Sequence, residues 1–318
     1  MRNNLSQMIS LSKVEEKLYR PADAFEHSRV TRLEHVNTTI VETPREGIIN
    51  VAKHIADVIR KREEVGQHVV LSLASGRTMR DLFTELVRMH KEEGLSFKNV
   101  IVFGSYEFYP LHDTTLGSMA QIQGQLLDHI DILPENIHTF PGDLPKEDID
   151  AFCNDYERAI AEVGGIDIQL LGVGQLGNIA MNEPGTQPNS STRLVIMDNN
   201  SRMDVKSLFG NATQVPNCAI TLGISTILQA KEVILLAFGQ HKAGIVKQAI
   251  EEVASATCPA SYLQLHKKAS FVLDLDAANK LTRINHPWKV TNCEWTDQLV
   301  RRAVVWLCEQ TQKPILKL

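Results

Sequence analysis

The chain has 318 residues, of which 43% are hydrophobic and 22% are charged, and its formal net charge is −5. This composition predicts a folded globular protein and argues against a disordered one. Acidic and basic residues are interspersed, so the sequence offers no extended basic surface for a nucleic-acid backbone, and no nucleic-acid partner is expected.

Targeting and cysteine patterns indicate a cytoplasmic protein. The opening stretch, "MRNNLSQMISLSKVEEKLYR", lacks the sustained apolar segment of a secretory signal. No stretch approaches the ~20 apolar residues that a membrane-spanning helix needs, so no membrane association is expected. The cysteines are odd in number and contain no C-x-x-C pair, which argues against a disulfide framework and a cysteine metal site: Cys153, Cys218, Cys258, Cys293 and Cys308. No bound metal is expected.

Short apolar runs and helical patterns alternate along the chain. Runs typical of buried strands cover residues 68–74, 99–104, 166–174, 193–197, 218–223, 232–239 and 270–275. Apolar residues at helical spacing cover residues 46–63, 78–92, 148–163 and 242–255. Because strands alternate with helices, we expect an α/β fold of three layers with a Rossmann-like, open and mainly parallel sheet.

Three parts of the chain are expected. Residues 1–39 form an N-terminal arm, and residues 40–282 form the principal domain. Residues 283–318 form a C-terminal helical extension, or a connector to a further domain. This last part holds apolar residues that share one helical face and would pack on another surface: Leu299, Val300, Ala303, Val304 and Leu307.

The segment "IQLLGVGQLGNIAMNEP" carries the pattern G-x-G-x-x-G at Gly172, Gly174 and Gly177. One interpretation is a dinucleotide site, because a predicted strand precedes the glycines and an acidic residue follows at the usual distance. Against it, "NEPGTQPNSST" places two prolines where the pyrophosphate-binding helix would run. The other interpretation is a tight turn that presents Asn182 and Glu183 at the carboxyl end of a strand, where open α/β sheets place their ligands.

The same segment resembles the glucosamine-6-phosphate deaminases, also called isomerases, which are relatives of the 6-phosphogluconolactonases. The family motif is similar to G-V-G-x-D-G-H-I-A-F-N-E-P, and this chain has "GVGQLGNIAMNEP". "LSLASGRT", "LLDHIDILPENIHTF" and "EVILLAFGQHKAGIVKQAIEE" match further family segments in the same order, and the resemblance covers about residues 45–280. It implies the fold of that family and a sugar phosphate as the small-molecule ligand.

The chain departs from the family pattern at the residues that the resemblance makes catalytic. Tyr106 stands where the family has an Asp that moves a proton between C1 and C2 of the opened sugar, and Glu107 beside it is retained. Leu176 and Asn178 replace the Asp and His that open the ring, whereas the carboxylate completing that relay is retained as Glu183. Losing one general acid or base commonly slows a reaction about 10²–10⁴-fold, so we expect the family reaction to be lost or weak.

The catalytic candidates are therefore Glu183, Glu107, Tyr106 and Asn178. Three histidines lie near this region in the sequence and are candidates to replace the missing catalytic base: His112, His129 and His138.

The phosphate-binding residues of the family pattern are better retained than its acid–base residues. In "SLASGRT" a turn follows a predicted strand and opens a helix, so its N–H groups can converge on an anion with the helix dipole behind them. The resemblance adds two lysines that contact the same phosphate. The residues expected to hold it are Ser75, Gly76, Arg77, Thr78, Lys206 and Lys242, and those that shape the site are Gly172, Gly174, Gly177 and Asn182.

The resemblance also implies assembly and regulation. Bacterial members have an anion-regulated site at subunit contacts, whose arginine resembles Arg193 and whose lysine is replaced here by Val195. A homo-oligomer is expected, while that regulation is not. Longer chains similar to this one carry a C-terminal domain of the deacetylase type, so a fused domain of that kind is expected.

The leading hypothesis is a deaminase-family protein that binds an amino-sugar 6-phosphate but has lost or weakened the reaction. The alternative is an active deaminase, sugar-phosphate isomerase or lactonase-like hydrolase that uses Glu183 and Glu107. A nicotinamide-dependent enzyme is the third interpretation, although no cofactor is expected.

Overall fold

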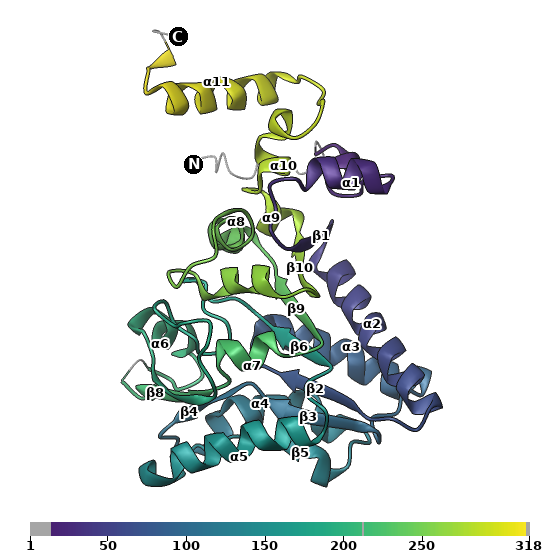
Figure 1. The fold of residues 1–318 in the computed structure, drawn as a ribbon, viewed down its shortest axis with the longest axis vertical. Helices are drawn as coiled ribbons and strands as arrows, with labels where there is room; N and C mark the ends of the chain where they lie inside the picture. The colour runs from purple at the N-terminus through teal and green to yellow at the C-terminus, as the bar shows by residue number, and fades with distance from the viewer. Residues whose placement is uncertain (1–13, 212, 316–318) are drawn as a thin grey trace.

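The computed structural model describes residues 14–211 and 213–315. Its centre is a seven-stranded parallel sheet with the strand order β1–β10–β9–β6–β2–β3–β5 (Figure 1). The strands are β1 (Asn37–Val41), β2 (Val69–Leu73), β3 (Val100–Gly104), β5 (Ile137–His138), β6 (Ile168–Leu171), β9 (Glu232–Ala237) and β10 (Ala269–Asp274).

Helices cover both faces of this sheet. Residues of β2 show why, because Val69, Leu71 and Leu73 face one apolar core while Val70 faces the other. The first core packs under α2 (Pro44–Glu64), α3 (Arg77–Glu93) and α4 (Ser118–Gln125). The second packs under α5 (Ile149–Glu162), α7 (Ile224–Leu228), α8 (Ala243–Glu251) and α9 (Leu275–Ala278). The predicted three-layer α/β fold with a mainly parallel sheet is therefore confirmed.

Two of the predicted strands lie outside the large sheet. β7 (Arg193–Ile196) and β8 (Cys218–Thr221) pair antiparallel, and β8 also pairs with β4 (Tyr106–Tyr109), which forms a second sheet of three strands. The expectation of a buried strand at 193–197 is wrong in its burial, because β7 is an edge strand and Ile196 is 80% exposed. A short apolar run does not distinguish an edge strand from a central one.

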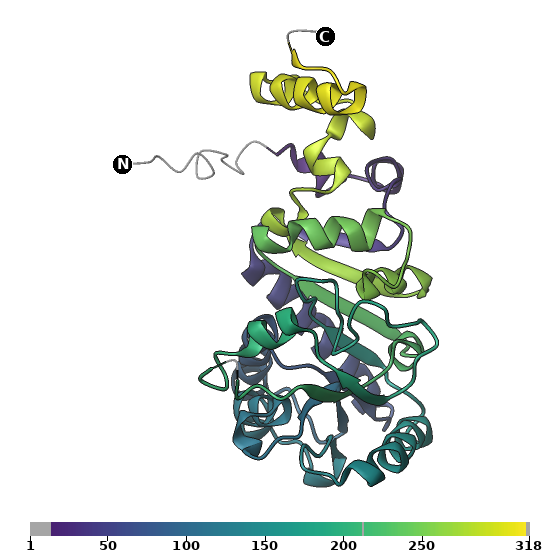
Figure 2. The same cartoon turned by 90° about the vertical axis from the view of Figure 1, so that its left-hand side faces the viewer.

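The first and last described helices lie at the same end of the sheet, beyond β1. α1 (Ala24–Val30), α10 (Thr282–Asn285) and α11 (Asp297–Thr311) lie together at the top of Figures 1 and 2. The expected boundary at residue 40 falls inside β1, which pairs with β10 along its whole length. Of the predicted apolar face of α11, Leu299 is buried, whereas Val300 and Leu307 are 45% and 42% exposed.

A buried ion pair joins these two regions to the sheet. The Arg283 Nε lies 2.9 Å from Glu34 Oε1, and the two side chains are 1% and 2% exposed. Arg283 also donates to the carbonyl of Thr38 at 3.0 Å. Burial raises the pKa of Glu34 to about 7, because desolvation of the carboxylate outweighs the attraction of the guanidinium.

This raised pKa predicts a pH-dependent stability. The folded protein binds a proton at Glu34 between its ordinary pKa of 4.5 and about 7, whereas the unfolded chain does not. The contribution of Glu34 to the free energy of unfolding is therefore present below pH 4.5 and is lost as the pH rises through 7. In urea titrations at pH 5.5 and pH 8, Glu34→Gln should lose a smaller part of its stability between the two pH values than the wild type does. An equal pH dependence in both proteins would contradict the assignment.

Candidate functional site

Three loops meet at the carboxyl edge of the large sheet. β9, β6 and β2 are neighbours, and all run in the same direction, so the loops that follow them lie side by side. They are residues 74–77, 172–184 and 238–242. Each holds sequence-predicted site residues, and ligands of open α/β sheets bind at this kind of edge.

The loop after β2 carries the predicted phosphate turn, residues 75–78. Gly76 is the N-cap of α3 with a φ of 138°, a conformation that favours glycine, and no side chain caps this helix end. Arg77 and Gly76 are exposed, and Thr78 and Ser75 are half-buried. The first N–H groups of a 17-residue helix therefore face an open edge, which is a favourable place for an anion.

Tyr106 lies beside this turn. Its phenol oxygen is 2.8 Å from the Ser75 hydroxyl, and the residue is only 8% exposed. Burial raises the pKa of Tyr106 above its ordinary value, so the phenol stays protonated at neutral pH. The group nearest the phosphate turn on β4 is thus a neutral hydrogen-bonding phenol.

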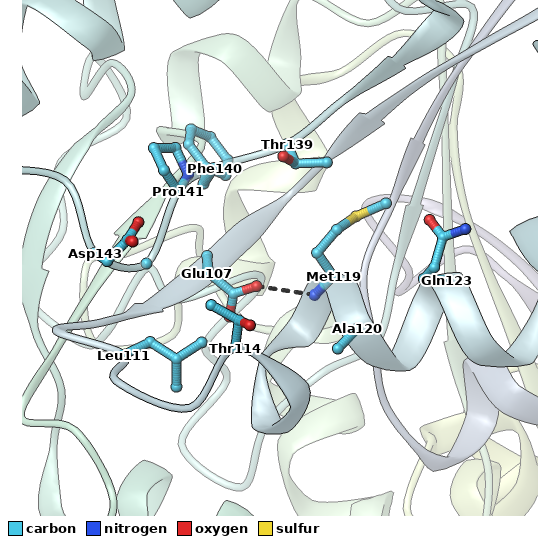
Figure 3. A pocket seen from close by; sticks show the side chains of 11 residues that line it. Glu107, Leu111, Thr114, Met119, Ala120, Gln123, Thr139, Phe140, Pro141 and Asp143 are labelled. Carbon is cyan, nitrogen blue, oxygen red and sulfur yellow. Dashed lines mark hydrogen bonds between the residues drawn. The ribbon is translucent and has the colours of Figure 1, made fainter. Parts of the chain in front are cut away.

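Glu107 points to the opposite side of β4. Its Oε1 accepts from Phe108 N and Ser118 N at 2.8 and 2.7 Å, and its Oε2 accepts from Met119 N at 2.9 Å. The carboxylate therefore caps the N-terminus of α4. It also borders a cavity of about 310 Å³ between α4 and residues 139–143 (Figure 3). Adjacent residues of a strand face opposite ways, so the sequence neighbours Tyr106 and Glu107 do not face the same site.

The loop after β6 forms a close-packed turn, residues 172–178, which we call the glycine turn. Gly174 donates to the carbonyl of Asn178 at 2.9 Å, and a Cβ at Gly174 would lie 1.8 Å from Asn178 Oδ1. Gly177 has a φ of +80°, and a Cβ there would lie 2.6 Å from Cys258 Sγ. A Cβ at Gly172, in contrast, would meet nothing within 4 Å, so no close contact requires a glycine at this position.

The dinucleotide interpretation fails at this loop. Residues 172–192 form turns and isolated bridges, and the next helix is α6 (Asn199–Val205). The pyrophosphate-binding helix that a dinucleotide loop must open is therefore absent from this described segment. Asp198, the acidic residue that had supported this interpretation, is the N-cap of α6, where its side chain accepts from Asn200 N.

Asn182 and Glu183 follow the glycine turn. The fully buried Asn182 amide donates to Ile179 O and Leu222 O at 3.1 and 2.8 Å, and its oxygen accepts from Arg193 at 3.1 Å. Asn182 thereby fixes the loop. Glu183 Oε1 accepts from the N–H of Asp198 at 3.2 Å, whereas its buried Oε2 has no hydrogen-bond partner among the described residues.

The pKa of the Glu183 carboxyl is raised above its ordinary value. Burial is the main cause of this rise, which the Ser201 hydroxyl and the N–H of Asp198 partly offset because they stabilise the carboxylate. The nearby carboxylates of Asp198 and Asp204 add a smaller raising effect. Asp204 lies on α6 and accepts from Gln175 Nε2 at 2.7 Å, so it links α6 to the glycine turn. One side of the site is therefore acidic.

The loop after β9 supplies the cationic side. Lys242 Nζ donates to Val173 O at 2.8 Å, so this ammonium lies against the glycine turn. Burial lowers its pKa, and Arg77 lowers it as well, which places the two cations within electrostatic reach of each other. Lys206 follows α6 as an exposed residue, and its side chain makes no hydrogen bond with the described residues that would fix it toward the turn.

The sequence prediction missed His241 in this loop. Its pKa is lowered by burial, by Lys242 and by Arg77, and is raised by Asp274 and Asp204. His241 directly precedes Lys242 in "GQHKAG", so it could have been found as the sequence neighbour of a residue already predicted to bind phosphate. The three candidate histidines of the sequence analysis lie in other segments of the chain: His138 stacks on Phe103, His129 contacts Gly124 O, and His112 is exposed.

Residues 14–211 and 213–315 contain neither a metal-binding cluster nor a membrane-spanning helix. In that part of the chain no group of three or more His, Cys, Asp or Glu side chains is placed to hold a metal ion. No helix described there is long and apolar enough to cross a bilayer.

The family model of glucosamine-6-phosphate isomerases/6-phosphogluconolactonase matches residues 42–272. The chain belongs to this family. The match includes the phosphate turn, the glycine turn and Lys242, and ends within β10.

Two relatives show how far this similarity extends. A glucosamine-6-phosphate deaminase-like protein of Bacteroides thetaiotaomicron is 50% identical over 319 aligned residues, which cover 100% of this chain and 48% of that protein. This chain thus spans about half the length of the Bacteroides relative. The glucosamine-6-phosphate deaminase of Shewanella woodyi is 41% identical over 233 residues, 73% of this chain and 88% of that enzyme.

Solved structures agree with the fold. A monomeric glucosamine-6-phosphate deaminase of the same superfamily superimposes with a TM-score of 0.73 at 32% identity, covering 77% of this chain and 99% of that one. The 6-phosphogluconolactonase of Trypanosoma brucei gives a TM-score of 0.61 at 22% identity, over 77% of this chain and 98% of that one, which shows a shared fold alone.

Proposed function

We propose that this chain binds an amino-sugar 6-phosphate at the carboxyl edge of its sheet and has lost, or retains only weakly, the deaminase reaction of its family. The observation that carries the proposal is the contact between Tyr106 and Ser75: a neutral phenol lies beside the phosphate turn where the family motif has a carboxylate. The chain would then serve as a binding or regulatory module.

The charges around the site support an amino-sugar phosphate as the ligand. The phosphate turn itself contains Arg77 and the uncapped N-terminus of α3, and Lys242 lies within electrostatic reach of Arg77. This combination suits a phosphomonoester. Asp204 lies within electrostatic reach of both Glu183 and Lys242, so acidic groups that suit an ammonium group or hydroxyls stand near the cations. A ligand that carries both a phosphate and an amine complements this combination of charges.

The acid–base groups support the loss of chemistry. Moving a proton between C1 and C2 needs a base within hydrogen-bond reach whose pKa can approach the working pH. Tyr106 has a raised pKa, Leu176 has no proton to exchange, and the Asn178 amide does not titrate in this range. Glu107 is committed to three backbone N–H groups on the other side of β4.

One observation favours the alternative of an active enzyme. Glu183 is a half-buried carboxyl of the site whose Oε2 makes no hydrogen bond with the described residues, and burial raises its pKa above the ordinary value, as is common for catalytic carboxyls. An isomerase, a residual deaminase or a lactonase-like hydrolase would have to work through this one residue, with Tyr106 donating a hydrogen bond to an oxyanion.

The cellular compartment, the assembly and the domain organisation of the chain are part of the same proposal. We propose a cytoplasmic homo-oligomer in which residues 40–282 form the sugar-phosphate domain, residues 1–39 an arm and residues 283–318 a connector to a deacetylase-like domain. Residues 1–13 of the arm and 316–318 of the connector lie outside the described residues. The free thiols of all five cysteines support a reducing compartment. The exposed apolar residues of α11 support packing against a further surface.

Binding calorimetry tests the proposal. Glucosamine 6-phosphate should bind the wild type saturably at pH 7.5, and Lys242→Met should weaken binding about tenfold or more, because a charge-assisted contact is removed. Lys231→Met is the matched control, since Lys231 pairs with Asp167 away from the site. Absence of binding to a folded wild type would overturn the proposal.

A further inference from the structure

His241 stands in the same loop as the phosphate-binding lysine, and its position is fixed by that loop. It lies in the short 3-10 helix Gln240–Lys242, which directly follows β9 and Gly239. Gly239 has a φ of +89°, and its N–H donates to both carboxylate oxygens of Asp274 at 2.9 and 3.1 Å. A Cβ at Gly239 would lie 3.0 Å from His241 Nδ1, so the imidazole folds back over the glycine.

Charged groups from four elements lie within electrostatic reach of this imidazole. The cations are Lys242 of the same short helix and Arg77 of α3, and the acids are Asp274 at the end of β10 and Asp204 of α6. Arg77 and Lys242 are the two cations of the phosphate site. His241 therefore lies where the phosphate turn and the lysine loop come together.

We propose that His241 is a third ligand-binding residue of the phosphate site, which contacts the phosphate of a sugar phosphate and takes up a proton when the dianion binds. The inference rests on the proposed function, because it requires a phosphomonoester in this site. The free imidazole is neutral at pH 7, since burial and the two cations lower its pKa below 6.5. A bound dianion reverses this balance by adding negative charge next to the ring.

The consequence is a coupling between protons and ligand. At any pH between the lower pKa of free His241 and its higher pKa in the complex, binding transfers a proton from solvent to the imidazole. Ligand affinity should therefore rise as the pH falls through this interval. Imidazolium donates a charge-assisted hydrogen bond to phosphate, whereas neutral imidazole donates only an ordinary one.

Calorimetry of the whole chain tests this proposal with glucosamine 6-phosphate as the probe. Titrations at pH 6.5 in two buffers with different ionisation enthalpies give the number of protons taken up per ligand. The wild type should take up more protons than His241→Gln, by up to about one, and should bind about tenfold more tightly at pH 6. Because the ligand is the same in both titrations, its own ionisations cancel in the comparison.

Matched controls separate the outcomes. His68→Gln should behave as the wild type, since this exposed histidine precedes β2 at the opposite edge of the sheet. NMR titration of the His241 ring in the wild type should show its pKa rising when ligand is added, which tests the proposal even if His241→Gln is poorly folded. Absence of binding to the wild type overturns the proposed function as well as this inference. Binding with equal proton uptake by wild type and His241→Gln, or an unchanged His241 pKa in the complex, overturns this inference alone.

Discussion

Restoring the family residues together, as Tyr106→Asp, Leu176→Asp and Asn178→His, should raise the rate of glucosamine 6-phosphate deamination at least about 10²-fold above the wild type. The reason is that Tyr106, Leu176 and Asn178 lack the acid–base groups that the family has at these positions, while the phosphate turn, Lys242 and Glu183 are retained. Fructose 6-phosphate and ammonia are measured together, with equal protein concentrations and a saturating amount of substrate.

Single replacements are the control for this experiment. Groups that act as one unit give non-additive effects, so Tyr106→Asp or Asn178→His alone should recover little. Adding Glu183→Gln to the triple variant should remove the gain, because it breaks the restored His–carboxylate pair. A folded triple variant that binds ligand but turns over no faster than the wild type would contradict the role given to these positions.

Gly177→Ala should lower the free energy of unfolding by about 3 kcal/mol or more, which combines the cost of a left-handed conformation with that of overpacking. The φ of Gly177 is +80°, and the new Cβ would lie 2.6 Å from Cys258 Sγ and 3.2 Å from its Cα. The glycine turn would have to move, so ligand affinity should fall as well. Urea denaturation and binding calorimetry measure the two effects.

Gly66→Ala isolates the conformational part of this cost. Gly66 has a similar φ of +66°, but a Cβ there would meet nothing within 4 Å. Its replacement should therefore cost only about 1–2 kcal/mol and leave ligand binding unchanged. Equal losses of stability in the two variants would show that the contact with Cys258 does not constrain the turn.

Much of the site could be predicted from the sequence because its loops are continuous segments. The glycine turn and the phosphate turn each follow a recognisable strand, and parallel strands bring their carboxyl ends to one edge. The family resemblance then supplied Lys242 from a third loop. These parts depend on local patterns that a single sequence contains.

The opposite orientations of Tyr106 and Glu107 could have been predicted from the alternation of side chains along a strand. β4 begins two residues after β3 ends and is only four residues long, so it was not recognised as a strand. Had it been, alternation along a strand would have placed the two side chains on opposite faces. Glu107 would then have been expected to act apart from Tyr106.

Other contacts leave no local signal. Glu34 and Arg283 are far apart in sequence and meet only because β1 pairs with β10 at the edge of the sheet. His241 acquires its surroundings from α3, α6 and β10, none of which is its neighbour in sequence. Such groups become visible only when the topology of the chain is known.

We expect the chain to bind glucosamine 6-phosphate without turning it over at a rate typical of its family. The most direct test incubates the wild type with saturating glucosamine 6-phosphate and follows fructose 6-phosphate and ammonia, after calorimetry has shown that the site is occupied. The account predicts an occupied site with little or no product. Rapid release of both products by the wild type, abolished by Glu183→Gln, would contradict it.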